Sequence, residues 1–336
     1  MLFDVAEEST IEAPSAKRGL DRIASRPLLL PSTLMALNAF VFVGGLVAVV
    51  WMGAVTSTDI VLLLVFHGIA ITGLTVGYHR LFSHRAFVVG PCTRAALGIA
   101  GALAAQGPIT DWVSRHRQHH RFSDREGDMH SPHWFQGRPL GLFRGLLHAS
   151  TTWLAYTPWA GPFPFVKDLE SDPVVQWVDR WHHLWLAAGM ALPALIGWTI
   201  YGTAAGAISG LFWGGILRVA LGHLLVSSVN SICHLWGSRP FATNDHSRNN
   251  LLLALVTNGD GWHNNHHAFP NAARHGFLPG QPDFGWRVIR ALERLGLAWN
   301  VKRIPDDMAS LEGILEARRT PAAGVRESIQ TIPQQR

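Results

Sequence analysis

The sequence contains very little cysteine. Of its 336 residues only two, Cys92 and Cys233, carry a thiol, and they form no pattern typical of a disulfide or of a thiolate metal site. A four-cysteine iron–sulfur cluster and a cysteine-attached haem are therefore excluded, and the chain also lacks a glycine-rich dinucleotide-binding loop. Any electrons that the protein uses must be delivered by another molecule.

Two long stretches lack charge almost completely. Between Pro31 and His79 there is no lysine or arginine and a single acid, Asp59, and between Trp181 and Leu217 there is no charge except what His182 and His183 carry. A membrane span needs about 20 apolar residues in a helix, so each stretch is long enough for two spans. We predict transmembrane helices over residues 29–52, 59–78, 183–201 and 207–229.

Basic residues predict the orientation of these helices. The connections 53–58 and 202–206 contain none, whereas the segments outside the helix pairs are rich in arginine. The positive-inside rule then places both termini and residues 79–180 in the cytoplasm. We expect an all-α integral membrane protein of four transmembrane helices with a helical cytoplasmic cap. Its parts are predicted to be a cytoplasmic N-terminal segment (1–27), one membrane domain (28–305) and a partly disordered tail (306–336).

The net charge of +5 indicates contact with anionic lipid headgroups or an anionic substrate. No nucleic-acid-binding motif accompanies it, so we expect no nucleic-acid partner.

Histidine is the unusually abundant residue. Of eighteen histidines, eight fall into three short motifs with the spacings H-x4-H, H-x2-H-H and H-x2-H-H. These eight are His79, His84, His116, His119, His120, His263, His266 and His267. Imidazole is the commonest protein ligand for metals, and one four-coordinate ion would leave half of them unused. The motifs therefore predict more than one metal ion.

Helical spacing indicates how the imidazoles divide. On a helix, His116 shares a face with His119 and His120, while the adjacent His119 and His120 diverge by about 100°, which suits two different ions. The same reasoning applies to the 263–267 motif. By contrast, His79 and His84 lie about 140° apart on an ideal helix, so this pair either bridges two centres or marks the end of a helix.

Longer segments surround these motifs: GYHRLFSHR (77–85), DW followed by HRQHH (111–120), DREGDMHSP (124–132), NSICHLWG (230–237) and GDGW with HNNHHAFP (259–270). These segments resemble the membrane fatty acyl desaturases, and most of all the bacterial acyl-CoA Δ9-desaturases of the stearoyl-CoA desaturase type. The resemblance extends from about residue 30 to 305 in consistent order.

The resemblance implies a di-iron centre with a ninth histidine ligand, His234, and a contact from Asn230 to one metal through water. It also implies O2 as co-substrate and external electrons, which reduce O2 to two waters while a cis double bond forms in an acyl chain, at Δ9 of an acyl-CoA. Zinc has no redox chemistry, although it can replace iron after overexpression because it binds nitrogen ligands more tightly than ferrous iron does.

The implied partners are a fatty acyl substrate, membrane lipid, and a ferredoxin, rubredoxin or cytochrome b5-type donor with its reductase. The implied location is a bacterial inner membrane, with the active site on the cytoplasmic side.

Five residues are candidates for contacts with the substrate. Gln106 and Trp112 match the residues that line the acyl tunnel in the family. Arg115, Arg144 and Lys167 are candidates for binding an anionic head group, and solvated surface charge explains them equally well. Two departures from the family weaken the Δ9 assignment. Asp260 stands where many relatives have Glu, and Val226–Ser227 stands where relatives often have Thr-Trp.

Two other classes of protein function remain open. A di-iron membrane hydroxylase of lipids or hydrocarbons would use the same histidines, although the N-S-x-x-H and WHNNHHAFP segments favour desaturation. A metal transporter would place polar ligands near the middle of the bilayer, whereas these motifs lie at or beyond the ends of the predicted helices.

Overall fold

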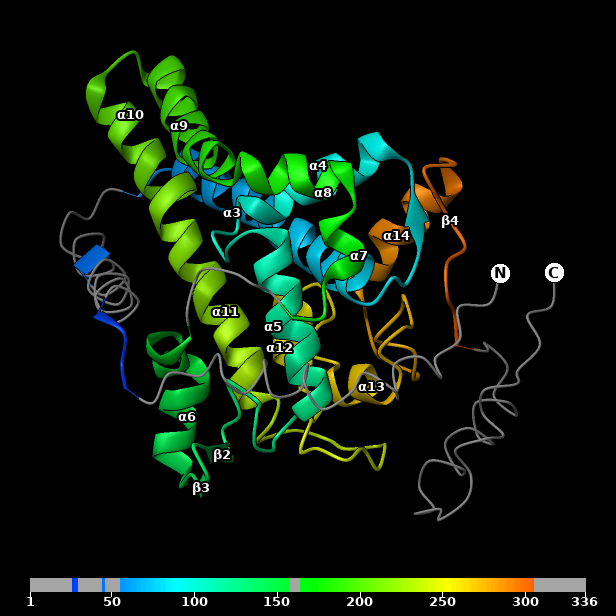
Figure 1. Ribbon diagram of the computed structural model, residues 1–336. Coiled ribbons are helices and arrows are strands. Elements are labelled where there is room, and N and C mark those ends of the chain that lie inside the picture. Colours follow the sequence, from blue (N-terminus) through cyan, green and yellow to red (C-terminus); the bar gives the residue numbers. More distant parts are fainter. Residues whose placement is uncertain (1–25, 30–43, 46–54, 158–163, 305–336) are drawn as a thin grey trace.

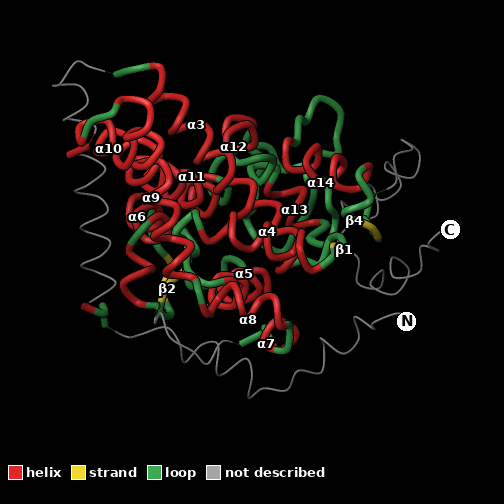
Figure 2. The backbone as a smooth tube through the Cα atoms, turned by 90° about the horizontal axis from the view of Figure 1, so that it is seen from above, coloured by secondary structure: helices red, strands yellow, loops and turns green. Residues whose placement is uncertain are grey.

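The computed structural model describes residues 26–29, 44–45, 55–157 and 164–304. The predicted membrane helix 29–52, the N-terminal segment 1–27 and the tail 306–336 lie almost entirely outside these residues. Within the described part the protein is mainly helical, with long helices at one end and shorter helices and loops at the other (Figures 1 and 2).

Among the described residues, three continuous helices are long and apolar enough to cross a membrane. They span Ser57–Ser83, His182–Tyr201 and Ala204–Ile232, with 27, 20 and 29 residues. The predicted helices 59–78, 183–201 and 207–229 lie within these spans or coincide with them. The first helix extends five residues beyond its predicted end, which brings His79 inside the helix. The extent of an apolar stretch indicates the centre of such a helix better than its ends.

The first and third of these helices combine α-helical and π-helical segments, whereas the second is α-helical throughout. The first consists of α3 (Ser57–Thr72) and the π-helix η2 (Gly73–Ser83). The second is α9 (His182–Tyr201). The third consists of α10 (Ala204–Gly210), the π-helix η4 (Leu211–Leu217) and α11 (Arg218–Ile232).

Polar contacts join the helix ends that lie farthest from the histidine motifs. Thr56 and Asp59 form a capping box at the start of α3, and the Ser209 hydroxyl on α10 donates to Asp59 Oδ1 at 2.5 Å. The hydroxyls of Thr56 and Tyr201, at the end of α9, are 3.0 Å apart. Gly202 has a φ of +64° and ends α9, so the chain turns directly into α10. This end holds the start of α3 against the α9–α10 turn.

The opposite end of the spans carries a cap of shorter elements, most of which lie in the lower and right-hand parts of Figure 1, with α4 and α8 in its upper middle. Its helices are α4 (Pro91–Ala102), α5 (Ile109–Phe122), α6 (Leu142–Ser150), η3 (Thr152–Tyr156), α7 (Lys167–Glu170), α8 (Pro173–Arg180), α12 (Leu251–Val256), α13 (His263–Ala268) and α14 (Phe284–Arg294). Its strands are β1 (Val88–Val89), β2 (Trp134–Phe135), β3 (Arg138–Pro139) and β4 (Ala298–Trp299), with β1 paired to β4 and β2 to β3, both antiparallel.

The main core lies where the first span meets this cap. Residues of η2, such as Val76 and Tyr78, pack with Ile109 and Val113 of α5 and Val178 of α8, and all five are fully buried. Close approach of η2 to α4 depends on small residues, because a Cβ on Gly73 would lie 2.1 Å from the backbone nitrogen of Gly101. This core holds the end of the first span rigidly against α5, and both elements carry histidine motifs.

Candidate metal centre

The structure brings the eight motif histidines and His234 together in two adjacent groups. We call His79, His84, His116, His120 and His266 the five-histidine cluster, and His119, His234, His263 and His267 the four-histidine cluster. In each group one ring nitrogen from every residue lies within 4.8 Å of all the others. The rings of His120 and His267 stack at 4.4 Å between centroids, so the two clusters are neighbours.

Adjacent histidines divide between the clusters as the helical spacing predicts. On α5, His119 belongs to the four-histidine cluster and His120 to the five-histidine cluster; on α13, His267 and His266 divide in the same way. Because neighbouring residues on a helix point about 100° apart, one short helix supplies ligand atoms to two centres.

Of the two possibilities predicted for the His79–His84 pair, the structure shows the helix end and not the bridge between two centres. Both belong to the same cluster, so the expectation that they bridge two centres is wrong, and the alternative of a helix end is correct, since η2 ends at Ser83. The reason is the π-helix, in which residues five apart are hydrogen-bonded. Here the His84 amide donates to the His79 carbonyl at 3.2 Å.

Ring nitrogens converge inside each cluster. In the five-histidine cluster, His266 Nε2 lies 3.0 Å from His79 Nε2 and 2.9 Å from His120 Nε2. In the four-histidine cluster, the Nε2 atoms of His234 and His263 are 2.9 Å apart. Such distances place several lone pairs around one point, as a bound cation requires.

Four aspartates hold the opposite ring nitrogens. Three serve the four-histidine cluster: Nδ1 of His119 lies 3.0 Å from Asp128, Nδ1 of His234 lies 2.8 Å from Asp124, and Nδ1 of His267 lies 2.7 Å from Asp245. One serves the five-histidine cluster, where Asp260 lies 2.9 Å from His79 Nδ1. A carboxylate that accepts the Nδ1 proton leaves the Nε2 lone pair free for a metal and makes it more basic.

The protonation states agree with this arrangement. Burial lowers the pKa of His84, His116, His120, His263 and His266 well below the usual value, and neighbouring histidines lower it further. These imidazoles are therefore neutral at pH 7, which is the form that binds a metal.

The backing carboxylates are ionised at the same pH. Burial raises the pKa of each carboxyl, but hydrogen bonds and charge from histidine outweigh burial. The pKa of Asp128 falls to about 2, and those of Asp124, Asp245 and Asp260 fall well below their usual range. Asp124 in turn raises the pKa of His234 despite the burial of that ring, which alone would lower it.

The donor set fits two transition-metal ions. Nε2 of His119 and of His267 are buried and have no hydrogen-bond partner within the described residues, which is costly unless another group takes the lone pair. Nitrogen donors suit iron, zinc, copper and nickel, whereas magnesium and calcium require oxygen. Soluble di-iron bundles use carboxylates as direct ligands; here the carboxylates stand behind the imidazoles.

Three other predicted site residues, Asn230, Trp112 and Gln106, differ in how they lie relative to the clusters. Asn230 is half-buried on α11, one turn before His234, and its water-mediated contact stays a prediction. Trp112 stacks on the His116 ring at 5.0 Å between centroids and packs against His79, which covers one side of the five-histidine cluster. Gln106 is half-buried in the α4–α5 connection.

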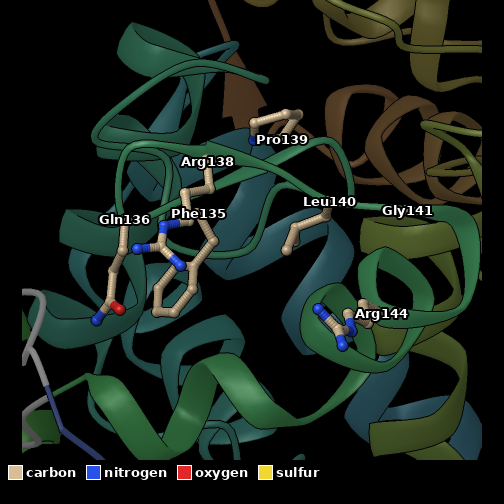
Figure 3. Close-up of a pocket in the computed structure, with 7 residues that line it drawn as sticks. All are labelled: Phe135, Gln136, Arg138, Pro139, Leu140, Gly141 and Arg144. Atoms are coloured by element: carbon tan, nitrogen blue, oxygen red, sulfur yellow. The ribbon is translucent and has the colours of Figure 1, made fainter.

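The three basic candidates for a head-group site are not brought together. Arg115 is buried and pairs with Asp111, one turn earlier on α5, with Nε 2.9 Å from Oδ1. Lys167 is exposed at the start of α7. Arg144 is exposed on α6 and lines a pocket of about 380 Å³ with Arg138 and the β2–β3 hairpin (Figure 3).

Sequence reasoning missed most of the supporting residues. Asp124, Asp128 and Asp245 were not selected, and Asp260 was noted only beside the third motif, whereas its carboxylate contacts His79 of the first. His275 was also missed; it shares Asp260 with His79, and its ring lies 4.5 Å from that of His266. Asp124, Asp128 and Asp260 do lie in segments that carry the family resemblance, 124–132 and 259–270, but the sequence does not indicate which acid pairs with which ring.

Comparison with known proteins agrees with this geometry. A family model described as "Fatty acid desaturase" matches residues 56–279. Hex-5-enoyl-(acyl-carrier protein) acetylenase of Moorena producens (strain JHB) is 38% identical over 258 residues, covering 76% of this chain and 80% of that protein. Delta-9 acyl-lipid desaturase 1 of Arabidopsis thaliana is 37% identical over 235 residues (68% and 70%). Icosanoyl-CoA 5-desaturase of Limnanthes douglasii is 35% identical over 235 residues (69% and 61%).

Proposed function

The chain belongs to the fatty acid desaturase family, and we propose that it introduces a cis double bond into a saturated acyl chain with O2 and externally supplied electrons. Family membership makes it an oxidoreductase that acts on a fatty acyl substrate. The observation that carries the proposal is the pair of imidazole clusters at one end of three membrane-length helices, backed by four buried or half-buried aspartates.

We propose that the five-histidine cluster holds one iron and the four-histidine cluster the other, with Asn230 reaching one of them through water. When bound, the iron pair supplies from O2 the oxidant needed to remove hydrogen from an unactivated methylene, which no side chain can do. The protein's own residues orient the ligands. Asp260, Asp128, Asp124 and Asp245 keep the Nδ1 protons of four imidazoles in place, so the Nε2 atoms stay deprotonated and directed inward.

An aromatic side chain covers one side of the five-histidine cluster. Trp112 covers His116 and His79, and the Tyr78 hydroxyl donates to the Gly107 carbonyl at 3.3 Å, which ties the start of α5 to the end of the first span. We propose that the acyl chain enters here, beside Gln106 and Trp112. An apolar chain has no polar handle, so the position of the double bond must be selected by the shape of its path.

The acyl carrier and the Δ9 position remain proposals. The names of the three relatives specify acyl-carrier protein, lipid and CoA, with positions Δ9 and Δ5 in two of them. We propose an acyl-CoA substrate, with its anionic head group near Arg144 and Arg138 in the pocket of Figure 3. Bidentate arginine contacts are well suited to phosphate. Arg115 is a weaker candidate because Asp111 already engages it.

We further propose a bacterial inner membrane location with the cap facing the cytoplasm, and a ferredoxin, rubredoxin or cytochrome b5-type donor with its reductase. The chain provides only two cysteines, so an electron-transfer cofactor bound by four thiolates must lie on another protein.

One experiment tests the reaction and its position together. The protein is expressed with a donor system in a bacterial membrane that lacks its own desaturase, and double bonds in the lipids are located by mass spectrometry. Acyl chains with a new cis double bond at Δ9 support the full proposal. A double bond elsewhere corrects the position only, while hydroxylated chains assign the protein to the hydroxylases. Saturated lipids from protein that contains two irons per chain contradict the proposal.

A further inference from the structure

The two clusters differ sharply in the negative charge behind their imidazoles. In the four-histidine cluster, three of four rings rest on an aspartate. These carboxylates are well shielded, with side-chain exposures of 0% for Asp128, 2% for Asp124 and 10% for Asp245. Their ion-pair partners among the described residues are histidines. Within the described residues, no arginine or lysine forms an ion pair with these three carboxylates. Arg239 contacts the backbone carbonyl of Asp245 and not its carboxylate.

In the part of the chain that the structure describes, a single aspartate pairs with a ring of the five-histidine cluster, and that aspartate is shared. Asp260 accepts from His79 and also lies 3.5 Å from Arg80 Nη2 and 3.3 Å from His275 Nδ1. Arg80 is completely buried, and its other terminal nitrogen lies 3.0 Å from Asp283. The group formed by Asp260, Arg80 and Asp283 thus carries one net negative charge, against three at the other cluster.

Charge behind a ligand changes the stability of the metal's oxidation states. A carboxylate that accepts the Nδ1 proton gives the ring partial imidazolate character and stronger donation to the metal. In a buried site the negative charge also acts on the metal directly, with little screening by solvent. Both effects favour ferric over ferrous iron, so they lower the reduction potential of the nearer ion.

We propose that the two iron positions are electronically inequivalent, the four-histidine cluster holding its iron at the lower reduction potential and the five-histidine cluster accepting the first electron. This rests on the proposed ligation of one iron by each cluster. With iron bound, the ferric ion held by the five-histidine cluster would take the first electron from the external donor, which is oxidised by one electron. The ion held by the four-histidine cluster would take the second.

A redox titration of the purified, iron-loaded holoenzyme tests this without any substrate. Mössbauer spectroscopy of enriched iron is expected to show two successive reduction waves, each of half the iron. In Asp128→Asn the second wave moves to higher potential and the first stays in place. In Asp260→Asn the first wave moves to higher potential and the second stays. Iron per chain is measured in every sample.

Asp128→Glu and Asp260→Glu keep the charge and separate an electrostatic effect from a loss of structure. Each is expected to return its wave toward the wild-type potential. The proposal is overturned if both irons are reduced in one wave, if the two asparagine variants move the opposite waves, or if each moves both waves equally. Wild-type protein that binds fewer than two irons contradicts the proposed ligation as well, whereas two irons with a single wave contradict only the inequivalence.

Discussion

The backbone of His84 hydrogen-bonds to that of His79, five residues earlier, through an amide-to-carbonyl contact of 3.2 Å. Their rings consequently lie 5.1 Å apart between centroids and face one cluster. In an ordinary α-helix this pair would diverge. The wider π-helix therefore places both histidines of the first motif at one centre, and π-helical turns occur frequently at functional sites.

Close packing against α4 holds the π-helix in position. A Cβ added to Gly73 would lie 2.1 Å from the Gly101 nitrogen, whereas nothing lies within 4 Å of a Cβ on Gly68 in the same span. We expect Gly73→Ala to reduce the free energy of unfolding by about 1–3 kcal/mol through overpacking. The matched variant Gly68→Ala is expected to be neutral or slightly stabilising. Thermal unfolding in detergent distinguishes the two variants. Equal unfolding midpoints would show that α4 can move to accommodate the added methyl group without loss of stability.

Arg117, inside the second histidine motif, links α5 to the end of η2. Its guanidinium donates to the carbonyls of Phe82 and Ser83 at 2.8 and 3.0 Å and forms two contacts with Asp168. Lysine keeps the charge but cannot reproduce this planar set of donors. We expect Arg117→Lys to cost about 2 kcal/mol of stability. Arg121→Lys, at an exposed position on the same helix, is the control, and a similar loss in both variants would refute the specific role of Arg117.

His148 is expected to contribute a pH-dependent loss of stability. Its buried Nε2 lies 3.1 Å from the Met129 carbonyl, and burial lowers its pKa to about 4. His148 binds a proton near pH 6.5 in the unfolded state but only near pH 4 in the folded state. The stability that neutral His148 contributes is therefore complete above about pH 6.5 and is lost as the pH falls toward 4. It amounts to at most about 3 kcal/mol.

His148→Gln removes this term. Its unfolding midpoint is therefore expected to fall less between pH 7 and pH 4.5 than that of the wild type. His183→Gln, at an exposed position on α9, should follow the wild-type curve. Parallel curves for His148→Gln and the wild type would exclude His148 as the source.

Loss of single cluster histidines is expected to abolish product and to lower iron content. His266 Nε2 lies 2.9 Å from His120 Nε2, and each ring contributes one of few donors to the five-histidine cluster. His120→Ala and His266→Ala should therefore insert normally but bind about one iron or fewer, because a lost ligand removes most of the affinity of its site. His183→Ala serves as the control. Normal turnover in either cluster variant would contradict the proposed ligation.

Adding iron or zinc to metal-free protein extends this test. Activity is expected to follow iron content and to be absent from the zinc form, since zinc has no redox chemistry. Both forms should raise the unfolding temperature, because each binds the folded state. Turnover by iron-free, zinc-loaded protein would rule out the proposed chemistry.

The amino-acid sequence by itself determined those features that depend on local spacing. Charge-poor runs predicted four spans, and the three that fall within the described residues are membrane-length helices in the structure. The 3.6-residue period separated His119 from His120 and His266 from His267, because neighbouring side chains diverge on any helix. His234 was reached only through the resemblance to a known family, since a lone histidine carries no pattern of its own.

Tertiary structure alone decided which groups meet across the chain. Asp260 lies 181 residues beyond His79, and Asp124 lies 110 residues before His234; no periodicity relates positions so distant. The π-helical turn at His79 was likewise hidden, because it depends on packing against α4 rather than on the residues of η2 alone. Local spacing sets the direction of a side chain relative to its own helix. The packing of that helix against the rest of the chain decides which charged groups lie beside the side chain. Here the number of aspartates behind the histidine rings distinguishes the two clusters.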